Sequence, residues 1–244
     1  MNILKSIMRN NLRSSKNIQL TPHQEKIKAT LQLSSDVDTS KPLTSIRFVT
    51  IDLEATGFKA TVSDKVLSLG AVVVENGRVN ENKTFYELVN PERTIPKNIT
   101  KLTGITENMI IDKPSLIEIL PHFFSWIGDG VLVGHIINFD ISFLNHCLNH
   151  QCGSRIKYKY IDTRDLITTL YPRFTNCSLE EICFSLGIPA HNRHNALGDA
   201  IMAAKIFEFS IKELAKRGVY TLEDLFNYTR DRQCFASPIT QILI

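Results

Sequence analysis

Residues 66–75 are almost entirely apolar and run directly into Asn76-Gly77. An apolar run of this length suits a buried strand, and Asn-Gly is the strongest short signal for a tight β-hairpin. The pattern therefore predicts an antiparallel strand pair, with the second member continuing to about residue 89. Another apolar run, over residues 46–53, predicts a strand that precedes this pair.

Beyond residue 89 the pattern changes to strands that alternate with helices. Short apolar strands are predicted at residues 131–135 and 158–162, and helical spacing of apolar residues is present at 114–126, 139–150 and 196–216. A capping box, Ser178 to Glu181, opens one more helix, which Gly187 ends. Three antiparallel strands followed by strand–helix units predict an α/β fold in which a mixed sheet is flanked by helices.

The positive charge of the chain lies near its N-terminus. Residues 1–46 hold seven Lys or Arg and three Asp or Glu, whereas the rest is nearly neutral. Residues 34–42 read as a polar linker, so we expect a basic N-terminal extension and linker at 1–44, a domain at 45–230 and an apolar tail at 231–244. The basic, acid-free start is typical of an organelle-targeting peptide, but a docked helix or an arm has the same composition.

Cysteine usage and hydropathy exclude several protein classes. The five cysteines are odd in number and include no Cys-x-x-Cys pair, which favours reduced thiols in an intracellular protein over a disulfide scaffold or a zinc site. No apolar run approaches the roughly 20 residues of a membrane span. We therefore expect a cytoplasmic protein without a membrane partner, and the basic N-terminus leaves organelle import open.

Four carboxylates stand at positions where predicted elements can bring them together. Asp52 and Glu54 are two residues apart at the end of a strand and so point to the same face. Asp140 follows the strand at 131–135, and Asp199 lies near the start of the last long helix. Such a cluster is unstable without cations, and oxygen ligands select Mg²⁺ or Mn²⁺. Two such ions are a known device for phosphodiester cleavage.

His194, five residues before Asp199, could supply the proton acceptor that this chemistry needs. Each residue has a simpler interpretation when taken alone. Asp52 and Glu54 could be a solvated strand end, Asp140 a helix N-cap, and His194 a loop residue beside His191. The occurrence of all five in order favours a metal-dependent active site.

Three segments, "IDLEATG", "GHIINFDISFL" and "HNALGDA", resemble the motifs of the DnaQ-like DEDDh family of 3′→5′ exonucleases, which includes proofreading subunits of bacterial DNA polymerases. The resemblance covers about residues 46–212 and implies a ribonuclease H-like fold. One position departs from the family, because Ile136 stands where its members usually carry Asn. We expect this departure to alter geometry or substrate preference without abolishing activity.

The resemblance also implies roles for single residues. Asp52, Glu54 and Asp199 would hold a first Mg²⁺ or Mn²⁺, and Asp52 with Asp140 a second, while His194 would be the general base. The residues implied to contact the 3′-terminal nucleotide are Thr56, Gly57, Phe58, Thr103 and Ile105. Phe58 would pack on a base.

These observations predict a 3′→5′ exonuclease that acts on a nucleic acid with a free 3′ end, single-stranded DNA above all. The same chemistry on RNA ends or short oligonucleotides is the main alternative, because the difference is a 2′-hydroxyl contact. A non-catalytic binding module is a third hypothesis. A role in DNA repair or proofreading would require a polymerase or other repair partner in trans.

Overall fold

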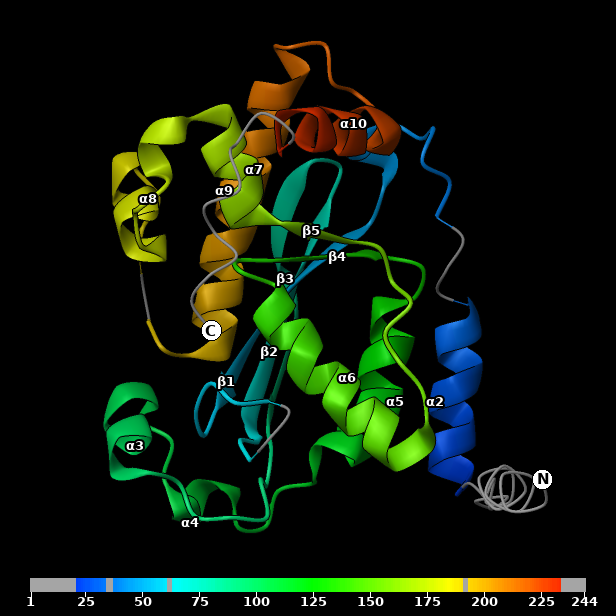
Figure 1. Cartoon of the computed structure of the whole chain (residues 1–244), viewed down its shortest axis with the longest axis vertical. Coiled ribbons are helices and arrows are strands. Elements are labelled where there is room, and N and C mark those ends of the chain that lie inside the picture. The colour runs from blue at the N-terminus through cyan, green and yellow to red at the C-terminus, as the bar shows by residue number, and fades with distance from the viewer. Residues whose placement is uncertain (1–20, 34–36, 61–62, 191–192, 234–244) are drawn as a thin grey trace, which may run out of the picture.

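The computed structural model describes residues 21–33, 37–60, 63–190 and 193–233. Its centre is a five-stranded sheet in the order β3-β2-β1-β4-β5 (Figure 1). The strands are β1 (Phe48–Ala55), β2 (Val66–Glu75), β3 (Arg78–Leu88), β4 (Val131–Gly134) and β5 (Tyr160–Asp162). The first three are antiparallel, whereas β4 runs parallel to β1 and β5 parallel to β4. This arrangement confirms the predicted α/β fold with a mixed, ribonuclease H-like sheet.

The predicted hairpin joins β2 to β3. Asn76 and Gly77 have φ values of 53° and 69°, and Glu75 pairs with Arg78 across the turn. Positive φ at both central residues is the geometry of a type I′ turn, which explains why Asn-Gly marks this position.

Helices pack on both faces of the sheet. Successive residues of a strand point to opposite faces, so neighbouring residues of β1 contact helices on opposite sides. On one face Phe48 packs against Phe207 of α9 (Ala196–Ala215), with ring centroids 4.8 Å apart. On the other face Val49 and Ile51 share a core cluster with α5 (Leu116–Ile127) and α6 (Asn138–Cys152). Figure 1 shows α9 and α6 on opposite sides of the strands.

Most of the other helices lie around the sheet and the three helices that cover it. They are α3 (Lys97–Thr103), α4 (Glu107–Ile110), α7 (Thr163–Leu170), α8 (Leu179–Ser185) and α10 (Leu222–Gln233). Of these, only α8 was expected from the sequence, and its capping box is present: Glu181 N donates to Ser178 Oγ at 3.2 Å, and Ser178 N donates to Glu181 Oε2 at 2.7 Å.

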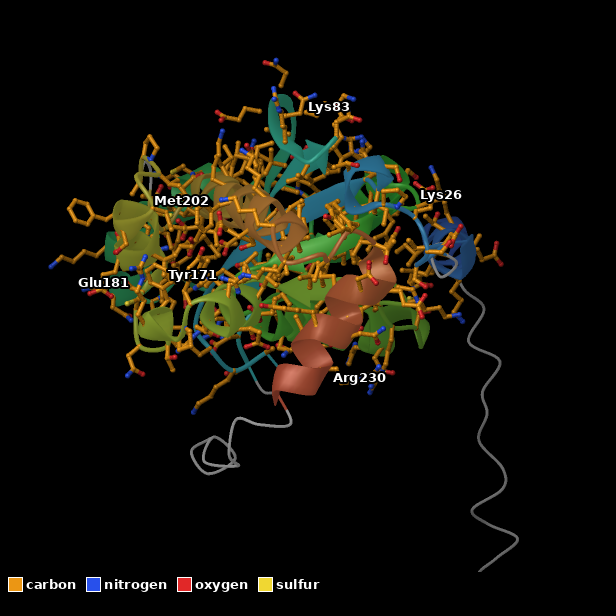
Figure 2. All side chains as sticks on the ribbon, turned by 90° about the horizontal axis from the view of Figure 1, so that it is seen from above. Lys26, Lys83, Tyr171, Glu181, Met202 and Arg230 are labelled. Carbon is orange, nitrogen blue, oxygen red and sulfur yellow. The ribbon has the colours of Figure 1, made fainter. Side chains whose placement is uncertain are left out.

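Helix α2 (Pro22–Leu33) lies inside the range expected to be an extension and linker. Its Ile27 and Leu31 are fully buried in the same core cluster as α5 and α6, because residues four apart share one helix face. Residues 22–33 therefore form a helix that packs on the domain. The docked-helix and arm alternatives concerned the basic start up to residue 24, most of which lies outside the described ranges. Figure 2 shows Lys26 of α2 and Glu181 of α8 at opposite ends of the molecule.

Several expectations concern residues outside the described ranges. The possible targeting segment falls on residues 1–20, and the apolar tail falls mostly on residues 234–244. The described cysteines, Cys147, Cys152, Cys177 and Cys183, are all free thiols. Within the described ranges no helix has both the length and the apolar character to cross a membrane.

Candidate active site

The four predicted carboxylates line one cavity of about 680 Å³, together with His194. Asp52 and Glu54 come from β1, Asp140 from the first turn of α6 and Asp199 from the first turn of α9. The end of β1 and the start of α6 meet because β1 and β4 are parallel neighbours, so the chain that leaves β4 toward α6 starts beside the end of β1. The expected convergence is therefore present.

Gly70 allows α9 to reach this cavity. It lies on β2 directly opposite Asp52, and a Cβ atom there would come within 2.3 Å of the backbone of Ala196 and of Leu197. A glycine is therefore needed for the start of α9 to pack on the sheet and carry Asp199 to Asp52. Sequence reasoning missed this residue, although a glycine inside a strand often marks a close backbone approach.

The junction between β5 and α7 holds the segment that precedes Asp140. Asp162 accepts hydrogen bonds from the backbone N–H groups of Ile136 at 3.1 Å and Ile137 at 3.0 Å, and it also caps α7. The side chain of Thr163 makes a hydrogen bond with His135 Nδ1 at 3.0 Å. These contacts fix the loop from which α6 starts and therefore fix the position of Asp140.

Burial raises the pKa of every carboxyl group in the cluster, and repulsion by other cluster members raises it further at Asp52, Glu54 and Asp140. Burial raises the pKa of Asp52 well above its usual value, and the charges of Asp140, Asp199 and Glu54 raise it further. Burial, followed by the charge of Asp199, raises the pKa of Glu54 to about 7. Burial likewise raises the pKa of Asp140 and of Asp199. The metal-free cluster is therefore electrostatically unfavourable in its ionised form.

Arg193 supplies positive charge to the cluster. Its Nη1 donates a hydrogen bond to Asp199 Oδ2, and its Nε lies 3.1 Å from Glu180 Oε1. The guanidinium lowers the pKa of Asp199, although burial outweighs it. Arg193 was not predicted from the sequence. The one pattern that could have indicated it is its position as a basic residue directly before the third motif.

The residues present fit divalent cations. One carboxylate oxygen of Asp140 and one of Asp199, both Oδ1, are buried without a hydrogen-bond partner. Glu54, His194 and Asp199 each offer a ligand atom, and these atoms lie within 4.8 Å of one another. Buried polar atoms are normally satisfied, and a carboxylate-rich donor set suits a hard ion.

Three of the predicted nucleotide-contacting residues, Gly57, Phe58 and Thr103, also line the cavity. The side chain of Phe58 is 82% exposed, and its ring centroid lies 5.9 Å from that of Phe139. An exposed aromatic ring at the wall of the cavity that holds the carboxylates is suited to stack on a base.

The other two predicted contacts, Thr56 and Ile105, do not line the cavity. Thr56 is buried, and its hydroxyl donates to Asp64 Oδ1 at 3.2 Å and accepts from Lys65 N at 3.0 Å. Ile105 is buried in a small apolar cluster with Leu67. Thr56 therefore holds the backbone at Lys65, and Ile105 packs in an apolar cluster; the contact of either residue with a nucleotide stays a prediction.

Comparison with known proteins gives matches in both sequence and fold. Residues 49–207 match the RNase_T family, described as exonuclease. The chain is 40% identical over 167 residues to the DNA polymerase III subunit epsilon of Aquifex aeolicus (strain VF5), covering 68% of this chain and 81% of that protein.

Two further matches extend the comparison. The DNA polymerase III PolC-type of Clostridium perfringens (strain 13 / Type A) is 36% identical over 167 residues, which span 68% of this chain but only 11% of that protein. The nuclease domain of 3'hExo, a DEDDh family member, bound to rAMP, has a TM-score of 0.62 at 19% identity, covering 70% of this chain and 94% of that one.

Proposed function

We propose that this chain, which belongs to the RNase_T family and is a DnaQ-like DEDDh 3′→5′ exonuclease, removes nucleotides from the 3′ end of single-stranded DNA. The observation that carries the proposal is the meeting of Asp52, Glu54, Asp140 and Asp199 in one cavity beside His194. The names of the two sequence relatives, both DNA polymerase III proteins, favour DNA as the substrate.

Divalent metals are used throughout this family, and the proposal here is two Mg²⁺ or Mn²⁺ ions. Asp52, Glu54 and Asp199 would hold one ion, and Asp52 with Asp140 the other. When bound, the ions stabilise the negative charge that develops on the phosphate and make water a better nucleophile near neutral pH. The two unpartnered oxygens of Asp140 and Asp199 support this assignment, because they are ready acceptors at the cavity wall.

His194 is the proposed general base. It lies at the cavity beside Glu54 and Asp199, so its neutral ring can accept a proton from the attacking water and the carboxylates can stabilise the imidazolium that forms. Phe58 would stack on the 3′-terminal base and hold the last phosphodiester bond near the carboxylates. Positioning of this kind reduces the entropy lost on reaching the transition state.

A 5′-labelled oligonucleotide tests the proposal directly. With Mg²⁺, the wild-type chain should shorten single-stranded DNA from its 3′ end, and excess EDTA or Asp199→Asn should stop the reaction. Duplex DNA and RNA of the same sequence, tested in parallel, decide between the main proposal and the RNA alternative. Undiminished cleavage in EDTA would refute the metal mechanism, and faster cleavage of RNA would refute the choice of DNA.

We further propose that the chain proofreads in trans for a polymerase, as the name of its relative of similar length suggests. Adding it to a polymerase stalled at a mismatched primer end should restore extension, and the Asp199→Asn variant should not. Restoration by the variant would show that nucleolytic removal of the mismatch is not involved.

A further inference from the structure

Ile136 has a backbone conformation that its side chain disfavours. Its φ is 62°, in the left-handed region, where a β-branched residue is a genuine outlier. Among the described non-glycine residues, positive φ occurs at Asn76, Glu92, Ile136 and His194. Asn76 suits this region, whereas Ile136 does not.

The strain coincides with the catalytic cavity. Ile136 and His194 both line it, whereas Asn76 and Glu92 do not. Strained backbone tends to gather at functional sites and persists only where surrounding contacts impose it. At Ile136 those contacts are visible, because Asp162 accepts hydrogen bonds from its N–H and from that of Ile137.

Burial in the free protein does not compensate for this strain. The side chain of Ile136 is 45% exposed, and Ile137, directly after it, is fully buried in the core. A large apolar side chain left in solvent at the wall of this cavity gains its stabilisation only when something covers it. Leu102, also 45% exposed, and Phe58 line the same cavity, so its wall carries several uncovered apolar side chains.

We propose that Ile136 is a substrate-contacting residue, whose side chain packs against the sugar and base of the nucleotide next to the scissile phosphate. The proposal rests on the proposed function, since the cavity that holds the carboxylates must also hold this nucleotide. Asp162 is the positioning residue that keeps Ile136 in its left-handed conformation. Covering the exposed half of the side chain strengthens substrate binding by about tenfold, given the value of burying an isoleucine.

The variant Ile136→Asn separates strain from contact, because Asn tolerates left-handed backbone but offers little apolar surface. In EDTA its melting temperature should rise by about 2–4 °C, the usual effect of relieving one such conformation in a domain of this size. Its Kd for a labelled oligothymidylate, measured in EDTA by fluorescence anisotropy so that the probe is not cleaved, should rise about tenfold. With Mg²⁺, KM should rise and kcat should stay nearly unchanged, because the contact exists before and during the reaction.

Two control variants isolate the effect. Glu92→Asn relieves a positive φ of 54° away from the cavity, so it should raise the melting temperature without changing Kd. Ile136→Val keeps both the strain and most of the apolar contact, so it should resemble the wild type in both measurements.

An unchanged Kd in Ile136→Asn, or a lower melting temperature, would overturn the proposal. A fall in kcat without a change in KM would also overturn it, since that result indicates a distorted metal site. Measuring Kd with oligouridylate as well separates a failure of the proposed function from a failure of the proposed role of Ile136. If the wild type binds either oligonucleotide but cleaves neither, the proposed function fails. The expected tenfold ratio between the Kd of Ile136→Asn and that of the wild type then still decides the role of Ile136. If it binds neither strand, both fail.

Discussion

Replacing Glu54 with Gln should stabilise the metal-free protein at pH 8. In the unfolded chain this carboxyl group loses its proton near pH 4.5, whereas in the metal-free fold burial and the charge of Asp199 raise its pKa to about 7. Between these values the folded protein binds more protons than the unfolded chain. The free energy of unfolding therefore falls as pH rises from 4.5, and the loss is complete above about pH 7.

The size of the effect follows from the same two values. At about 1.4 kcal/mol per pKa unit, the difference between 4.5 and about 7 corresponds to roughly 3 kcal/mol. This figure is an upper limit, because protons shared among the neighbouring carboxylates relieve part of the repulsion. Since Gln keeps the shape and removes the charge, Glu54→Gln should gain up to this amount at pH 8, or up to about 6–12 °C in melting temperature.

Thermal melts in EDTA from pH 4 to pH 8 measure the effect. The melting temperatures of Glu54→Gln and the wild type should coincide near pH 4 and separate as pH rises, whereas Glu87→Gln, at a half-exposed position on β3, should follow the wild type throughout. Added Mg²⁺ should stabilise the wild type at pH 8 much more than it stabilises Glu54→Gln. Equal melting temperatures at pH 8 in EDTA would refute the view that Glu54 belongs to a repulsive cluster.

Three further predictions address catalysis, packing and the N-terminal helix. His194→Ala should lower the cleavage rate by about 10²–10⁴-fold, measured in single turnovers, and His191→Ala should not; the reverse result would reassign the base. Gly70→Ala should reduce the free energy of unfolding in urea by about 1–3 kcal/mol, because its Cβ would meet the backbone of α9. Deleting residues 1–33 should lower the free energy of unfolding in urea by about 3–6 kcal/mol, since two fully buried side chains of α2 are lost.

Local sequence patterns were sufficient for much of the fold and for the identity of the cluster. The apolar run before Asn76-Gly77 predicted the central hairpin because that turn needs positive φ at both central residues. The spacing of Asp52 and Glu54 placed both on one strand face because side chains alternate along a strand. The order of the motifs then added Asp140, His194 and Asp199.

The elements that the sequence did not predict are short or mostly polar. Helix α2 consists largely of polar and charged residues, and among its side chains that the structure describes only Ile27 and Leu31 are fully buried, so its pattern resembles that of a solvated segment. Helix α7 has eight residues and follows β5 without a loop. Such segments are helical chiefly because tertiary packing stabilises them, and intrinsic propensity contributes less.

Strand alternation and motif spacing, which act over a few residues, were enough to identify the side chains of the cluster. How the cluster is held follows from contacts within the fold. Gly70 leaves room for α9, Arg193 donates to Asp199, and Asp162 fixes Ile136 in left-handed backbone. Each of these depends on contacts formed only after the chain folds, and Asp162 and Ile136 are 26 residues apart. A local pattern records the preference of a residue for its own conformation, whereas packing can impose a conformation that the residue alone would not adopt.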